Sequence, residues 1–160
     1  MKKRTQGFTL IEVIIYIALF SLLMGAAFIT AFEIIDNSDD LSFKNTTQKE
    51  GNFVLRKIDW ALTGAQTVIV PTSSITNNLR LTKYDGSNVE ICLHANKIKI
   101  REGSFGACSD SSYLPITTDN VSVSALNFEF IAASGTGPSG IKASGTIDGS
   151  NFTITKYLRK

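Results

Sequence analysis

The sequence has few of the residues that usually build catalytic and metal-binding sites. Its 160 residues include one histidine, His94, and two cysteines, Cys92 and Cys108. Two cysteines cannot complete a four-ligand structural zinc site without histidine or carboxylate groups. G-x-S-x-G, H-E-x-x-H and P-loop motifs are also missing. We therefore expect no enzyme, no cofactor and no metal site, with His94 a structural residue rather than a metal ligand.

Clustered positive charge is missing from most of the chain. Lys2, Lys3 and Arg4 account for +3 of a formal net charge of +2, so the remainder carries −1. Nucleic-acid binding needs clustered Lys and Arg that neutralise several phosphates at once. Because the later basic residues are scattered, we predict no direct nucleic-acid partner.

The two cysteines allow one intramolecular disulfide. If the body of the chain lies outside the cytoplasm, a bond between Cys92 and Cys108 would close a short loop. On a loop-entropy argument, this bond would stabilise the fold by about 3 kcal/mol. Two independent thiols are the alternative, and the sequence leaves both open.

Charge and proline are both absent from Val13 to Phe32, a run of twenty residues. As a helix this run would be about 30 Å long, the thickness of a bilayer core. It exceeds the apolar region of a secretory signal peptide, which is about 7 to 15 residues. The basic residues precede the run, so the positive-inside rule predicts an extracytoplasmic body. The aspartates that follow have no known metal-loop spacing and are expected on a solvated helix face: Asp36, Asp39 and Asp40.

Glu12 places a carboxylate within the apolar stretch, four residues after Phe8. An acidic side chain at mid-bilayer costs roughly 2.5 to 3.5 kcal/mol, and less towards an end. Either Glu12 reaches the cytoplasmic interface, or it has a partner in the membrane.

The segment Gly7-Phe8-Thr9-Leu10-Ile11-Glu12-Val13, behind a short basic leader, resembles the class III signal of type IV pilins and pseudopilins. The resemblance implies cleavage after Gly7 by a prepilin peptidase, followed by N-methylation of Phe8. It also implies that Glu12 attracts the α-amine of a neighbouring subunit during assembly. The implied partners are the prepilin peptidase, other pilin or pseudopilin subunits, an inner-membrane assembly platform and the membrane.

The later sequence predicts an α+β fold in which a long N-terminal helix packs on a C-terminal antiparallel sheet. One helical face carries a set of apolar residues: Val54, Ile58, Ala61, Leu62 and Ala65. Trp60 is expected in or beside the core, with an exposed binding role as the alternative. We expect a removed leader at 1–7, a transmembrane or filament-core helix at 8–32, an amphipathic helix half at 33–66 and an extracytoplasmic β domain at 67–160.

Six segments have the alternation of strands, and we expect them to form one antiparallel meander. They are Leu79–Tyr84, Val89–His94, Lys97–Glu102, Val121–Ile131, Gly140–Ile147 and Phe152–Leu158. Asp85-Gly86 and Ala95-Asn96 have turn chemistry between neighbouring strands. Ile98 and Ile100 are expected on the buried face, whereas 103–115 and 134–140 are predicted to be surface loops.

The body also resembles the J-type minor pseudopilins of type II secretion and the W-type minor pilins. The cues are Leu55-Arg56-Lys57-Ile58-Asp59, Asp119-Asn120-Val121, Leu126-Asn127-Phe128-Glu129-Phe130 and Tyr157-Leu158-Arg159. This resemblance favours a minor subunit, and Glu12 argues against the K-type tip subunit. Three functions stay in competition: a filament subunit, a single-span anchored binding or adhesion domain, and a membrane-tethered enzyme. The filament subunit is preferred because it explains Gly7, Phe8 and Glu12 together.

Overall fold

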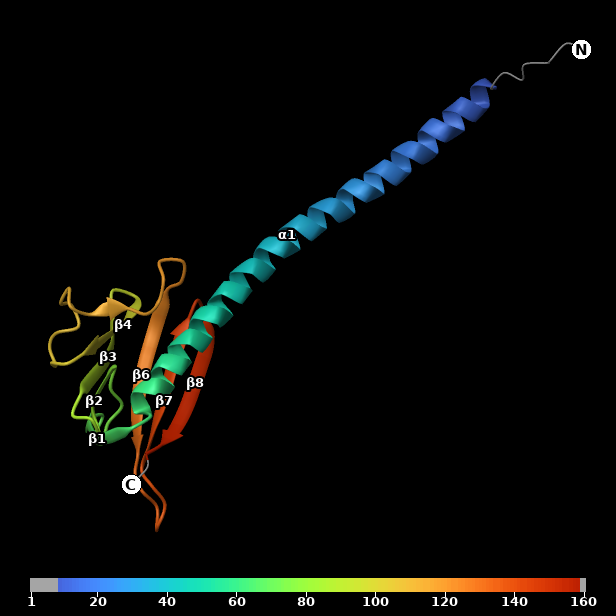
Figure 1. Ribbon diagram of the computed structural model, residues 1–160. Coiled ribbons are helices and arrows are strands. Elements are labelled where there is room, and N and C mark those ends of the chain that lie inside the picture. The colour runs from blue at the N-terminus through green and yellow to red at the C-terminus, as the bar shows by residue number, and fades with distance from the viewer. Residues whose placement is uncertain (1–8, 159–160) are drawn as a thin grey trace, which may run out of the picture. The chain divides into compact units, whose positions relative to one another are not determined.

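The computed structural model describes residues 9–158, apart from the side chain of Asp39. The chain divides into two compact units, Met1–Phe43 and Lys44–Lys160. Helix α1 (Leu10–Leu62) begins in the first unit and ends in the second, and all the strands belong to the second (Figure 1). The α+β architecture predicted from the sequence is confirmed.

In the first unit, α1 carries an apolar surface that no described residue covers. Among the described residues, α1 is the one helix long and apolar enough to cross a membrane, and its most apolar stretch is entirely unburied. The hydroxyls in this stretch bond to the helix backbone: Ser21 donates to the Ile17 carbonyl at 2.8 Å and Thr30 to the Ala27 carbonyl at 3.0 Å. These bonds reduce the cost of placing hydroxyl groups in an apolar medium.

In the second unit, the last turns of α1 pack on strands. The residues of the predicted apolar face are buried: Val54, Ile58, Ala61, Leu62 and Ala65. Gly51 lets the helix lie close to the sheet, because an added Cβ would stand 2.1 Å from the ring of Phe152. Thr47, also buried, donates to the Asp148 carboxylate at 3.0 Å. These contacts place the helix against the last strand, Ser150–Tyr157, and the turn that precedes it.

The helix ends at Leu62, before the expected limit at residue 66. Gly64 has φ 77°, a left-handed conformation that glycine adopts without steric cost and that commonly ends helices. Ala65 is buried as expected, but it belongs to strand β1 (Ala65–Val70), which the sequence analysis missed. β1 exists because it pairs with the next strand, with bulges at two points.

The strands form two antiparallel sheets, so the expectation of one meander is wrong. The first sheet has the order β1, β2 (Asn78–Lys83), β3 (Asn88–His94), β4 (Lys97–Glu102) and β5 (Leu114–Pro115). The second has the order β6 (Val123–Ile131), β7 (Gly140–Ile147) and β8 (Ser150–Tyr157). The short strand β5, at the end of a segment predicted to be a loop, pairs with the edge of β4 that a meander would give to β6.

The two sheets and α1 enclose one core. Backbone bonds join the sheets where Phe128 pairs with Thr76, at 2.7 and 3.0 Å. Ile98 and Ile100 are buried as predicted, 1% and 8% exposed. Ala95 and Asn96 form the predicted turn between β3 and β4, with positive φ at both residues. Gly86 has φ 80° in the other predicted turn. The alternation of the sequence therefore locates the strands that line the core.

Candidate assembly motif and the network under the disulfide

The assembly motif begins outside the described residues and ends on α1. Gly7 and Phe8, the predicted cleavage and methylation positions, lie outside the described residues. Glu12 lies in the first turn of α1, and its backbone N–H donates to the Thr9 carbonyl at 3.1 Å. A carboxylate in a first helical turn is favoured by the unpaired N–H groups there and by the helix dipole.

Glu12 has a hydrogen-bond donor one turn along the helix. The hydroxyl of Tyr16 donates to Oε1 of Glu12 at 3.1 Å. Residues four apart share a helix face, so this contact follows directly from the spacing. Glu12 was predicted from the sequence and Tyr16 was not, although the i, i+4 spacing and the scarcity of polar groups nearby are both visible in the sequence.

Cys92 and Cys108 are joined by a disulfide, with their Cα atoms 6.2 Å apart. Cys92 lies on β3 and is 3% exposed, whereas Cys108 belongs to the segment predicted to be a loop. The bond attaches this segment to the face of β3 that is not turned to the core. It explains why consecutive residues of β3, from Val89 to Cys92, are all buried.

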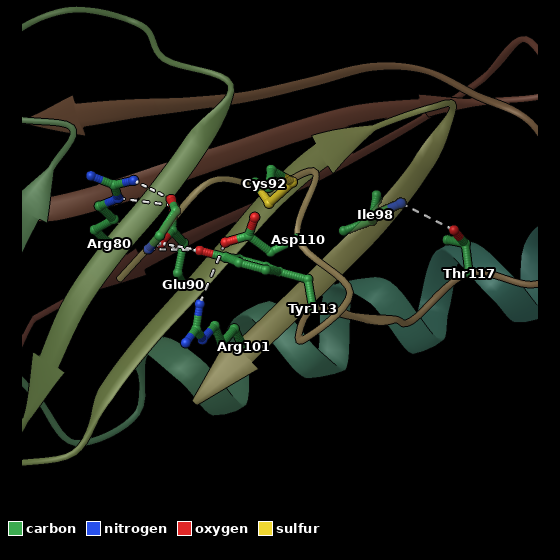
Figure 2. Close-up of a disulfide and its surroundings, with 10 residues drawn as sticks. Arg80, Glu90, Cys92, Ile98, Arg101, Asp110, Tyr113 and Thr117 are labelled. Atoms are coloured by element: carbon green, nitrogen blue, oxygen red, sulfur yellow. Dashed lines mark hydrogen bonds and ion pairs between the residues drawn. A yellow bond between two sulfur atoms is a disulfide. The ribbon is translucent and has the colours of Figure 1, made fainter. Parts of the chain in front are cut away.

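A buried polar network lies beside the disulfide (Figure 2). Its centre is the Glu90 carboxylate, which is 2% exposed and forms an ion pair with Nε of Arg80 at 2.8 Å. The Tyr113 hydroxyl donates to the other Glu90 oxygen at 2.7 Å. The Gly106 N–H lies 3.3 Å from that oxygen and 3.0 Å from the Tyr113 hydroxyl. Each Glu90 oxygen therefore has a donor, as a buried charge requires.

Arg80 and Arg101 connect this network to the rest of the loop. Arg80 also donates to the Gly106 carbonyl at 2.9 Å, and its guanidinium lies over the Phe105 ring at 5.7 Å. Arg101 lies over the Tyr113 ring at 5.4 Å and forms an ion pair with Asp110 at 3.9 Å. The network thus holds the loop through contacts independent of the disulfide, and its charges are mutually paired rather than directed at a ligand.

Among the described residues, two side chains have a pKa that departs from its ordinary value. Burial, followed by the hydrogen bond to Glu90, raises the pKa of the Tyr113 hydroxyl. The hydroxyl and backbone N–H of Ser87 both donate to Asp85 in the turn between β2 and β3, and they lower the pKa of that carboxyl. Burial and structural hydrogen bonds account for these shifts, and neither brings a group into the range useful for acid–base catalysis near neutral pH.

Other residues singled out in the sequence have surface positions. His94 is exposed at the end of β3, and the described residues contain no group of three metal-ligating side chains. Trp60, expected in or beside the core, lies outside the core cluster and is 41% exposed, so it is not a core residue. Its ring is covered by Nζ of Lys83, 3.4 Å from the centroid. Asp36 and Asp40 are exposed as predicted, and the Asp39 side chain lies outside the described residues.

Residues 2–28 match the family model described as the prokaryotic N-terminal methylation motif. No curated protein and no solved structure matches the chain. The matched segment includes Gly7, Phe8 and Glu12, and it continues into the apolar part of α1.

The motif and the helix-and-sheet architecture support a type IV pilin-like protein. Its apolar N-terminal helix fits a membrane-anchored precursor of a pilin-like subunit. The cues for a J-type or W-type subunit lie after residue 28 and so outside the match.

Proposed function

We propose that the chain is a minor structural subunit of a type IV pilus or pseudopilus. A prepilin peptidase cuts the precursor between Gly7 and Phe8, Phe8 is N-methylated, and the mature chain assembles through α1. The observation that carries the proposal is the motif match over residues 2–28, within which a carboxylate lies in the first turn of an uncovered apolar helix. An anchored binding domain would need the helix but not Gly7, Phe8 or Glu12.

The apolar part of α1 supports assembly in two environments. In the precursor, its side chains contact lipid, with the basic leader in the cytoplasm and the β domain outside. In the filament, the same side chains pack against the helices of other subunits. These side chains are more than 50% exposed in the isolated chain, so they can contact lipid in the precursor and other helices in the filament. They are Ile14, Ile17, Leu19, Phe20, Leu22, Leu23, Phe28 and Ile29.

Glu12 supplies the register of this assembly. Cleavage exposes an α-amine on Phe8, and pairing with a neighbour's Glu12 offsets the desolvation of both charges. Two unpaired charges in hydrocarbon would be costly, so subunits are held at the position along the filament where the pair forms. The partners are therefore the peptidase, other pilin-like subunits and the inner-membrane assembly platform.

The role of the β domain in this proposal is structural. The charged side chains of the network around Glu90 are paired with one another and hold a loop. A filament subunit needs no catalytic group or cofactor of its own, because the assembly machinery supplies the energy for assembly. The resemblance of the body to J-type and W-type subunits supports the minor role.

The test follows Gly7 and Glu12 variants in the native host. Gly7→Ala is expected to retain its leader, whereas Glu12→Ala is expected to be cut normally but to be missing from the sheared filament fraction. Glu33→Ala is the matched control, because Glu33 is an exposed glutamate on the same helix outside the motif. A wild-type chain that keeps its leader and is missing from the sheared filament fraction would support an anchored domain instead.

A further inference from the structure

The hydroxyl of Tyr16 donates a hydrogen bond to the carboxylate of Glu12, the residue proposed to pair with a neighbour's α-amine. We propose that Tyr16 is a positioning residue for assembly: its hydroxyl fixes the Glu12 carboxylate so that the free oxygen faces the incoming α-amine. This inference rests on the proposed function, since it concerns how Glu12 meets the amine of the next subunit.

The first evidence is the isolation of the pair. Tyr16 and Glu12 are the only residues from 10 to 20 whose side chains can form hydrogen bonds. The Tyr16 hydroxyl donates to Oε1 of Glu12 at 3.1 Å. The side chains around Tyr16 are apolar, and Val13, Ile17 and Phe20 line one groove with it. Thr9, three residues before Glu12, carries the other hydroxyl nearby, but the donor to the Glu12 carboxylate in the structure is the Tyr16 hydroxyl.

A second observation is that the Glu12 carboxylate can accept more hydrogen bonds than the one from Tyr16. An ionised carboxylate has two oxygens and accepts several hydrogen bonds. Tyr16 occupies Oε1, which leaves Oε2 for the α-amine. A glutamate side chain has three rotatable bonds, and an amine that meets a fixed carboxylate loses less conformational freedom on pairing. The tyrosine thus prepares the site before the neighbour arrives.

The simpler alternative is an interfacial tyrosine that anchors the helix at the membrane surface. An anchor would affect every contact between neighbouring helices, because it sets the depth of the whole segment. A positioning residue would affect the contact made by Glu12 and leave more distant contacts unchanged. Two cross-links at different depths therefore distinguish the roles.

The experiment uses the full chain, co-expressed with a prepilin peptidase and reconstituted in vesicles of phosphatidylethanolamine and phosphatidylglycerol. A lipid-soluble carbodiimide joins a carboxyl to an amine in contact with it, and mass spectrometry quantifies the Phe8–Glu12 product between chains. The second cross-link is a disulfide through Gly25→Cys, which adds one free thiol because Cys92 and Cys108 are bonded.

Tyr16→Phe keeps the ring and removes the hydroxyl. We expect its Phe8–Glu12 product to fall by roughly tenfold or more, the effect of losing one hydrogen bond to a charged group. The Gly25→Cys cross-link should be unchanged. Ser21→Ala is the matched control, because it removes another hydroxyl of the same helix that bonds only to a backbone carbonyl. It should leave both products at wild-type levels.

Equal Phe8–Glu12 yields in the wild-type chain and in Tyr16→Phe would overturn the inference. Loss of both cross-links in Tyr16→Phe would also overturn it and would identify an anchor. Absence of the Phe8–Glu12 product from the wild-type chain, with cleavage complete, would instead contradict the amine pairing in the proposed function. The failures of the two claims are thus separate results.

Discussion

The Tyr113 hydroxyl donates to the buried Glu90 carboxylate at 2.7 Å, across the loop that the Cys92–Cys108 disulfide attaches to β3. Glu90 precedes Cys92 by two residues on the same strand, so both face the loop. The loop is therefore held at two neighbouring points, one covalent and one through hydrogen bonds. This arrangement makes the stability of the β domain depend on particular side chains rather than on apolar burial alone.

Removing the Tyr113 hydroxyl should destabilise the domain. Tyr113→Phe keeps the ring but deprives Glu90 of a donor, and an under-satisfied buried acceptor costs about 1 to 3 kcal/mol. Denaturant unfolding of the full chain in detergent, followed by tryptophan fluorescence, measures the change. Tyr157→Phe alters a tyrosine that is 57% exposed and should change the free energy of unfolding by less than about 0.5 kcal/mol. Equal effects of the two variants would contradict the role of the network.

Alkaline pH should weaken the same domain through Tyr113. Its pKa is raised above the ordinary value of 10.0, so the folded state holds the proton more tightly than the unfolded state. The resulting stabilisation is fully present below pH 10 and is lost as the pH rises through the folded-state pKa. Unfolding free energies measured between pH 8 and about 11 should fall more steeply in the wild-type chain than in Tyr113→Phe. Parallel pH profiles would exclude this contribution.

Reducing the disulfide should lower stability without releasing the whole loop. The bond spans 16 residues of sequence, for which the loop-entropy model gives about 3 kcal/mol. We expect a reductant to lower the denaturation midpoint of the wild-type chain but not that of Cys92→Ser/Cys108→Ser. Because the Glu90 network is unchanged, the reduced protein should still protect Tyr113 from iodination. A reductant-insensitive wild-type midpoint would show that the disulfide contributes no stability.

Adding a methyl group at Gly51 should disturb the packing of α1 on β8. The new Cβ would stand 2.1 Å from the Phe152 ring, well inside van der Waals contact. Overpacking of this kind costs about 1 to 3 kcal/mol, which outweighs the better helix propensity of alanine. Gly51→Ala should therefore unfold at lower denaturant, and Gly51→Ala/Phe152→Leu should recover part of the loss. A stabilised Gly51→Ala would mean that Phe152 moves aside at no cost.

The spacing of apolar residues in the sequence correctly predicted which faces of β4 and of the end of α1 are buried. Ile98 and Ile100 alternate with basic residues, and that alternation correctly assigned both to the core. The helix face from Val54 to Leu62 was likewise readable from its spacing. β1 was missed because Ala65 continues the helical spacing of apolar residues, while the pairing of β1 with β2 depends on residues ten or more positions away.

The division into two sheets could not be predicted from the sequence either, because it also depends on pairing between distant residues. It depends on β5, two residues long, taking the edge of β4. The Glu90 network was also missed, because Arg80 and Tyr113 are 10 and 23 residues away and become its partners only in the folded chain. The assembly motif differs, since Gly7, Phe8 and Glu12 form one continuous segment that can be recognised before any folding is considered.

The most direct test of the pilin-like account is the intact mass of the full chain after co-expression with a prepilin peptidase. The account predicts a product shortened by the seven residues of the leader, beginning at an N-methylated Phe8. Gly7→Ala should keep the full precursor mass under the same conditions. A wild-type chain that retains residues 1–7, or is cut elsewhere than between Gly7 and Phe8, would contradict the central claim.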